Sequence, residues 1–261
     1  MSLRLVPRLL AFAFAGLLGL LAGALPALPA SWLGRALELG SGGRALLLET
    51  TGTVWHGGGR PAFRSGGNTD DERISAFPGA VEWRFAGLSF GPLRLKLELA
   101  GERVFSNPVL LELGATGPLA LSPGRMALPV EALEGIGAPF NTLRLGGRLE
   151  AGWQALAWER GLPQGPISLE WRDARSAVSA VAPLGSYRLD VLPDPNGFAL
   201  ALATLQGPLS LEGNGHWQRG GRFGFNGRAS AAADQRAQLQ PLMNLLGPSN
   251  GDGVALRIGS S

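Results

Sequence analysis

Leucine alternates with polar residues through much of this chain, and this pattern constrains the fold more than any other feature. The clearest example is "LRLKLELA" at 93–100, in which every second residue is leucine and the residues between are charged except at the end. A period of two residues places one set of side chains on each face of an extended strand. The pattern therefore predicts β-strands that bury one face and expose the other.

Glycine and proline divide these strands. The chain has 40 glycines and 19 prolines among 261 residues, and a Gly-Pro-apolar motif recurs as "GPLRL" at 91, "GPLAL" at 117, "GPISL" at 165 and "GPLSL" at 207. Glycine supplies turns, and proline at the start of a strand needs no ladder donor. The uneven spacing argues against a solenoid with a fixed repeat. It predicts a mainly β domain, one twisted antiparallel sheet or meander that could curl into an open groove or roll.

Two further elements complete the predicted domain. The turn "PDPNG" at 193–197 predicts a hairpin between "SYRLDV" and "FALALATL". The segment "DQRAQLQPLMNLLG" predicts a short C-terminal helix with Asp234 as N-cap, Gly247 as its end and a break or restart at Pro241.

The N-terminus predicts a membrane anchor. Arg4 and Arg8 precede a stretch without charge that runs from Leu9 to Gly34. About 20 apolar residues suffice to span a bilayer, and flanking arginines stay on the cytoplasmic side. The apolar residues expected to contact lipid are Leu9, Leu10, Phe12, Phe14, Leu17, Leu18, Leu20 and Leu21.

This interpretation divides the chain into a cytoplasmic tail (1–8), a transmembrane anchor (9–30), a linker (31–41) and a periplasmic β domain (42–261). A cleaved signal peptide is the alternative, with Ala22-Gly23-Ala24 as its small-residue cleavage site. The anchor interpretation is preferred because the apolar run continues to Leu28 and is followed by Trp32, which suits the outer interface. Both interpretations export the β domain.

Composition and motifs argue against several function classes. The formal net charge of +3 includes Arg4 and Arg8, and the remaining charges are interspersed, so no clustered basic face for nucleic acid is expected. The chain has no cysteine and only two histidines, His56 and His216, so neither a metal site nor a catalytic set is predicted. The acidic run Asp70-Asp71-Glu72 lies in a glycine-flanked polar loop. No enzyme activity and no cofactor are expected.

Several segments, taken in order, resemble one known family. These are "TGTVWHG" at 51–57, "VEWRFAGLSFGPLRLKLEL" at 81–99, "FNTLRLGGRLEAGW" at 140–153, "PLGSYRLDV" at 183–191 and "LQGPLSLEGNGHW" at 205–217. Together with the closing "LQPLMNLLGPSNGDGVALRI", they resemble protein N of the type II secretion system, the general secretory pathway protein N family. The residues that carry the resemblance, in structural roles, are Gly52, Thr53, Val54, Trp55, Trp83, Arg84, Gly207, Pro208, Leu209 and Trp217.

The resemblance implies a single-pass protein of the inner membrane with a periplasmic domain. It implies a non-enzymatic accessory or assembly component that supports export of folded proteins across the outer membrane, with other type II secretion subunits as partners. The partner surface is not specified; strand edges and hairpin tips are candidates. The alternative is an AsmA-like envelope protein that binds or transfers lipid along a β groove.

Overall fold

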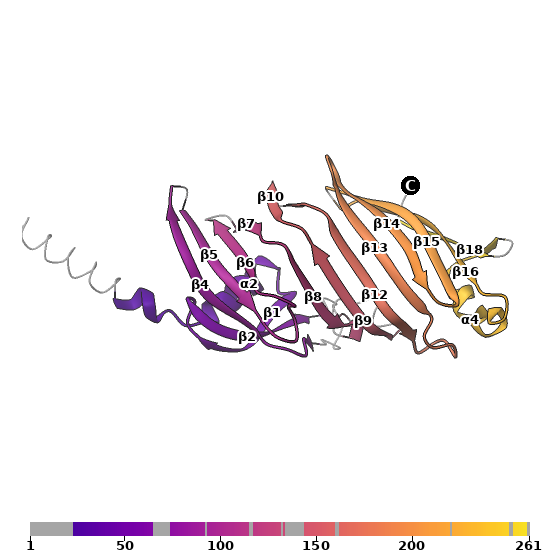
Figure 1. The fold of residues 1–261 in the computed structure, drawn as a ribbon, viewed down its shortest axis with the longest axis horizontal. Coiled ribbons are helices and arrows are strands. Elements are labelled where there is room, and N and C mark those ends of the chain that lie inside the picture. The colour runs from indigo at the N-terminus through magenta and orange to yellow at the C-terminus, as the bar shows by residue number, and fades with distance from the viewer. Residues whose placement is uncertain are drawn as a thin grey trace, which may run out of the picture.

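The computed structural model describes residues 23–64, 74–91, 93–114, 117–131, 133, 144–159, 162–219, 221–250 and 253–259. Antiparallel strands stand in a long row from the N-terminal to the C-terminal end of the molecule (Figure 1). The prediction of a mainly β protein is confirmed. The strands form two hydrogen-bonded sheets rather than the one predicted.

The first sheet has the order β1-β2-β4-β5-β6-β7-β10-β11, with β3 paired to β2. Its strands are β1 (Ala45–Gly52), β2 (His56–Arg64), β3 (Ile74–Ala76), β4 (Val81–Phe90), β5 (Leu93–Ala100), β6 (Val109–Gly114), β7 (Gly117–Leu121), β10 (Leu156–Glu159) and β11 (Leu162–Gln164). In its centre, the alternating segment 93–100 forms β5 as predicted, paired with β4 and β6.

The second sheet has the order β17-β18-β16-β15-β14-β13-β12-β9-β8. Its strands are β8 (Gly124–Pro129), β9 (Leu145–Trp153), β12 (Ile167–Ser176), β13 (Gly185–Asp194), β14 (Gly197–Gln206), β15 (Leu209–Gln218), β16 (Phe223–Ala231), β17 (Ser249–Asn250) and β18 (Gly253–Ile258). The predicted hairpin at 193–197 is present, with Asp194 opposite Gly197.

Three chain segments pass from one sheet into the other with only two residues between strands. Ser122 and Pro123 separate β7 from β8, and equally short breaks separate β9 from β10 and β11 from β12. Ser122, in the first of these breaks, is hydrogen-bonded to two strands. Its hydroxyl oxygen accepts from Leu110 N at 2.8 Å, and its carbonyl oxygen accepts from the Trp153 indole N–H at 2.9 Å. Ser122 therefore hydrogen-bonds to a strand of each sheet, β6 and β9, at the point where the first sheet gives way to the second.

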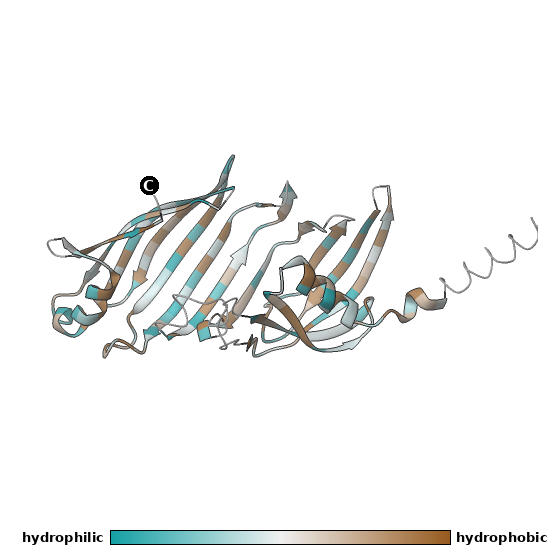
Figure 2. Cartoon of the chain, turned by 180° about the vertical axis from the view of Figure 1, so that it is seen from behind, coloured by the Kyte–Doolittle hydropathy of each residue, from teal (hydrophilic) through white to brown (hydrophobic). Residues whose placement is uncertain are grey.

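The strands of the second sheet have one apolar and one polar face, and Figure 2 shows the alternation along them. One cross-strand row of the apolar face links Leu128, Leu149, Trp171 and Tyr187. The polar face carries ion pairs, among them Arg172 to Glu150 at 3.3 Å and Arg188 to Asp190 at 2.9 Å. The second sheet thus has one buried and one solvent-exposed face, as the period-two pattern predicts.

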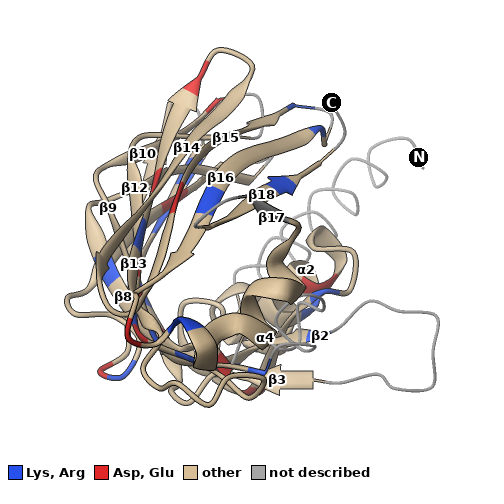
Figure 3. Cartoon of the chain, turned by 90° about the vertical axis from the view of Figure 1, so that its right-hand side faces the viewer, with Lys and Arg blue, Asp and Glu red and all other residues tan. Residues whose placement is uncertain are grey.

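Helices α2 (Ser31–Gly40) and α4 (Arg236–Leu246) both lie on the concave side of the curled strands (Figure 3). Helix α4 inserts Leu239, Leu242 and Met243 into the main core, against Leu209 and Phe225 among others. The apolar face is therefore the concave one. A second, smaller cluster forms where Phe77 packs with Leu128.

The C-terminal helix is confirmed but differs from prediction in detail. It begins after Gln235 rather than Asp234, with no side-chain cap, and it continues through Pro241. A proline inside a helix costs about 3 kcal/mol. The burial of Leu239, Leu242 and Met243 on both sides of Pro241 offsets that cost.

The N-terminal prediction is only partly within the described residues. All eight residues of the predicted lipid-contacting set lie in 1–22, outside the described part. From residue 23 onward, the described helices are all too short or too polar to cross a membrane. The predicted linker at 31–41 contains α2, which packs on β1, preceded by the 3-10 turn η1 (Leu25–Ala27).

Candidate functional site

The first group of motif residues forms a tight turn between β1 and β2. Gly52 has φ of +82°, a conformation that favours glycine. The Thr53 hydroxyl oxygen accepts from the backbone N–H of Trp55 at 3.3 Å and of His56 at 3.2 Å. The Thr53 side chain thus accepts hydrogen bonds from the backbone of the turn itself. The positive φ at Gly52 and these bonds explain why glycine and threonine stand side by side here.

This turn holds the segment that enters the domain from the N-terminus. The Trp55 indole N–H donates to the Leu25 carbonyl at 2.6 Å. Val54 N donates to the Leu28 carbonyl at 2.9 Å, and Ala30 N donates to the Gly52 carbonyl at 3.1 Å. We call residues 25–30 with the turn 52–55 the N-terminal clamp. It fixes the path of the chain just before α2.

Aromatic side chains support the clamp from the neighbouring strand. Trp83, which is buried, donates its indole N–H to the Thr53 carbonyl at 3.0 Å. Trp55 meets Phe85 edge-on with ring centroids 5.7 Å apart. Gly57 makes room for Trp83, because a Cβ at position 57 would lie 2.8 Å from Trp83 Cζ2. Sequence reasoning did not single out Gly57 or Phe85, since neither role is visible without the pairing of β2 with β4.

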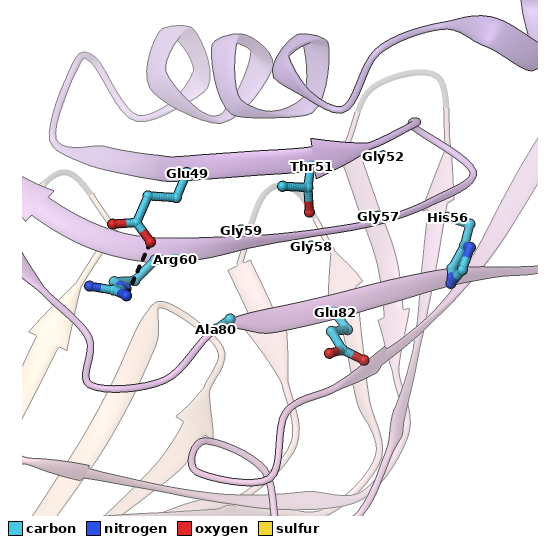
Figure 4. Close-up of a pocket in the computed structure, with 10 residues that line it drawn as sticks. All are labelled: Glu49, Thr51, Gly52, His56, Gly57, Gly58, Gly59, Arg60, Ala80 and Glu82. Atoms are coloured by element: carbon cyan, nitrogen blue, oxygen red, sulfur yellow. Dashed lines mark ion pairs between the residues drawn. The ribbon is translucent and has the colours of Figure 1, made fainter.

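A depression of about 390 Å³ adjoins the clamp (Figure 4). It lies over the glycine strand 57–59, and an ion pair of 3.1 Å between Arg60 and Glu49 stands at one end. Thr51, His56 and Glu82 also line it. Arg60 and Glu49 pair with each other, and the depression is open to solvent, so it offers no enclosed site for a ligand.

The remaining motif residues are distant from the clamp. Gly207 has φ of +120° and precedes β15, and Leu209 is 2 % exposed in the main core. Trp217 lies near the other end of β15 and stacks with Phe198 at 5.6 Å. Arg84 is beside the clamp but pairs outward with Glu98 at 2.8 Å. The structure thus divides the motif set into a clamp group at one sheet and a core group at the other.

Residues considered for chemistry have structural partners or lie outside the described part. His216 is on the polar face, where it lies against Gly224. Ser186, a further hydroxyl-bearing candidate, is buried and accepts from Asp173 N at 3.3 Å. Asp70, Asp71 and Glu72 are outside the described residues. Within the described ranges, no group of three or more acidic or histidine side chains is placed to hold a metal ion.

Three titratable groups respond to their surroundings. Burial raises the pKa of Tyr187, whose hydroxyl donates to the Leu209 carbonyl at 2.9 Å. The hydrogen bond from Lys96 lowers the pKa of Glu112, helped by the charges of Lys96 and Arg94. Asp190 raises the pKa of Arg188. All three contacts occur within the sheets, so they stabilise strands rather than activate a reacting group.

The apolar face is the other candidate surface. Ile167, Leu169, Val191 and Leu200 point to the concave side of the second sheet and are half-buried. Helix α4 contacts β16 and β18, at one end of this sheet. The face continues into the first sheet, since a Cβ at Gly124 would touch both Val109 and Trp153. Apolar surface of this kind suits an apolar ligand or a packing partner.

The structure defines a mainly β protein, in which two antiparallel sheets share an apolar concave face and the N-terminal segment is bonded to the turn at 52–55. The family model described as type II secretion system (T2SS), protein N matches residues 45–257, so this chain belongs to that family. Members of this family are structural components of the secretion system, and the family is not a known enzyme family. Neither the search of curated proteins nor that of solved structures found a match.

Proposed function

We propose that the chain is a non-enzymatic accessory or assembly component of the type II secretion system, held in the inner membrane with its β domain in the periplasm. Family membership over residues 45–257 carries the proposal. The N-terminal clamp supports it, because it bonds residues 25–30, the end of the predicted anchor, to the first sheet. The partners would be other subunits of the same machine, in the membrane or the periplasm.

The β4–β5 hairpin is the contact surface that we propose for a partner. Phe90 at its tip is 83 % exposed and Leu93 is 60 % exposed. Strand β2 pairs with β4 only over Val81–Arg84, and residues 86–90 have β5 alone as a strand partner in the part of the chain that the structure describes. An open edge beside exposed apolar side chains suits strand addition.

The test is an in-frame deletion in the source organism, complemented with the full chain or with variants. Loss of secreted proteins from the medium, with retention in the periplasm and an intact outer-membrane barrier, is the expected phenotype. A Phe90→Ser/Leu93→Ser variant should fail to restore secretion. Leu192→Ser/Leu205→Ser is the matched control, because both leucines are 50 % exposed elsewhere. Normal secretion in the deletion strain would contradict the proposal.

A second candidate function is lipid binding on the concave apolar face. The observation in its favour is the row of half-buried aliphatic side chains at Ile167, Leu169, Val191 and Leu200. Acyl chains are the ligand that such a face would take. The full chain would be purified in detergent and its bound phospholipid measured.

The control uses neighbouring positions on opposite faces of β14. Leu200→Arg should lower bound phospholipid, because it places a charge on the apolar face. Ala201→Arg should leave it unchanged, because residue 201 is exposed on the polar face. Equal phospholipid in both variants, or none in the unmodified chain, would exclude this candidate.

A further inference from the structure

Helix α2 presents apolar side chains outward. Trp32 is 62 % exposed and Leu39 is 74 % exposed. Their spacing of seven residues places them on one side of the helix, with Ala36 between them and Arg35 beside them, both exposed.

The opposite side of α2 is the one that packs on the sheet. A Cβ at Gly34 would lie 3.6 Å from Leu47 Cβ in β1. Glu38, on the same side, pairs with Arg64 at 3.3 Å. The helix is therefore oriented by contacts on its inner side, and the outward direction of Trp32 and Leu39 is a property of the fold.

The clamp fixes where this outward surface lies along the chain. Helix α2 begins at Ser31, directly after Leu25–Ala30, and both Leu28 and Ala30 are bonded to the turn at 52–55. Six residues reach at most about 20 Å even when fully extended. The outward surface of α2 therefore stays close to the point where the uncharged stretch that begins at Leu9 joins the domain.

We propose that the outward side of α2 lies in the periplasmic surface of the membrane that holds the N-terminal segment. Tryptophan favours the headgroup level, leucine favours the acyl boundary, and a neighbouring arginine suits anionic headgroups. This inference rests on the proposed anchor. The domain is then attached twice, by the anchor and by α2, which fixes its tilt relative to the bilayer.

The absence of cysteine from the chain makes a direct test possible. Single cysteines at positions 39, 245 and 18 of the full chain would carry an environment-sensitive fluorophore, in vesicles of phosphatidylethanolamine and phosphatidylglycerol. Leu245 is the matched control, an exposed leucine (65 %) on the distant helix α4. Lipids with a nitroxide near the headgroup or near the chain end would serve as quenchers.

For Leu39→Cys, we expect blue-shifted emission and stronger quenching by the nitroxide near the headgroup, since an interfacial helix sits at shallow depth. Leu245→Cys should emit as in water and be quenched by neither lipid. A water-like signal at position 39 with deep quenching at position 18 would overturn this inference alone. It would favour a protein partner on α2.

Water-like signals at positions 18 and 39 together would instead overturn the proposed anchor, and with it this inference. Trp32→Cys provides an independent probe of the same helix side and should behave like Leu39→Cys. Both positions are exposed, so neither substitution removes a core contact.

Discussion

The indole N–H of Trp55 donates to the carbonyl oxygen of Leu25 at 2.6 Å, across 30 residues of chain. This bond links the turn after β1 to the segment that leads into the domain. It gives a structural reason for the tryptophan in "TGTVWHG" without any role in chemistry. The consequences of this and of three other contacts can be measured.

Trp55→Phe should loosen the N-terminal clamp. The phenyl ring keeps a partner for Phe85 but cannot donate to Leu25. The lost hydrogen bond should lower the free energy of local opening by about 1 kcal/mol, which raises the opening equilibrium about fivefold. Hydrogen exchange at the amides of Ala30 and Val54, which donate across the clamp, should become faster. Trp171→Phe is the control, because it removes a comparable indole bond to Gly146 in the second sheet. Equal exchange at Ala30 in both variants would contradict the clamp.

Gly57→Ala should destabilise the domain by about 1–3 kcal/mol, the usual cost of overpacking. Its Cβ would meet the backbone carbonyl oxygen of Thr51 and lie 2.8 Å from Trp83 Cζ2, and the buried indole cannot shift without losing its bond to Thr53. Gly58→Ala is the matched control, since its nearest contact is an ordinary 3.5 Å to the Val81 carbonyl. In denaturant unfolding, the free energy of unfolding should be highest for the unmodified chain, lower for Gly58→Ala and lowest for Gly57→Ala. An equal loss in both would contradict the assigned packing.

Tyr187 is the only tyrosine in the chain, so its titration can be followed by tyrosinate absorbance. Burial raises its pKa in the folded state above the ordinary value of 10.0. Its contribution to stability is therefore complete below pH 10 and decreases as the pH rises further. The native protein should show no tyrosinate near pH 10, and the denatured chain should titrate there. Tyr187→Phe should show neither signal, and half-ionisation of the native protein near pH 10 would contradict the buried bond.

Glu112 should make stability fall in acid. Its pKa in the folded state is below the ordinary value of 4.5, chiefly because Lys96 donates to it at 2.9 Å. A lowered pKa contributes stability that is present above pH 4.5 and is lost as the pH falls through the folded-state value. The effect is under about 1 kcal/mol for a pair of this exposure. Unfolding midpoints should show a smaller acid loss in Glu112→Gln, and an unchanged loss would contradict the pairing.

The period-two pattern alone determined the class of fold. "LRLKLELA" forms β5 because alternating leucines and charged residues suit a strand with one buried and one solvent-exposed face. "PDPNG" forms a two-residue turn because its residues favour that geometry. The same sequence could not reveal that the strands would separate into two sheets. That outcome depends on contacts between segments distant in sequence, such as those that Ser122 makes with Leu110 and Trp153.

The candidate site divides in the same way between sequence and tertiary structure. The turn residues Gly52 and Thr53 are recognisable from sequence, because positive φ and a side-chain turn bond are local properties. The role of Trp55 is not recognisable from sequence, because its partner Leu25 is 30 residues away and lies in the range predicted as the anchor. The outward side of α2 was also hidden, since only packing against β1 decides which side of a helix remains free. The conformation of a turn can thus be predicted from its own residues. The contacts of each exposed or buried side chain depend on which strands and helices the fold brings together.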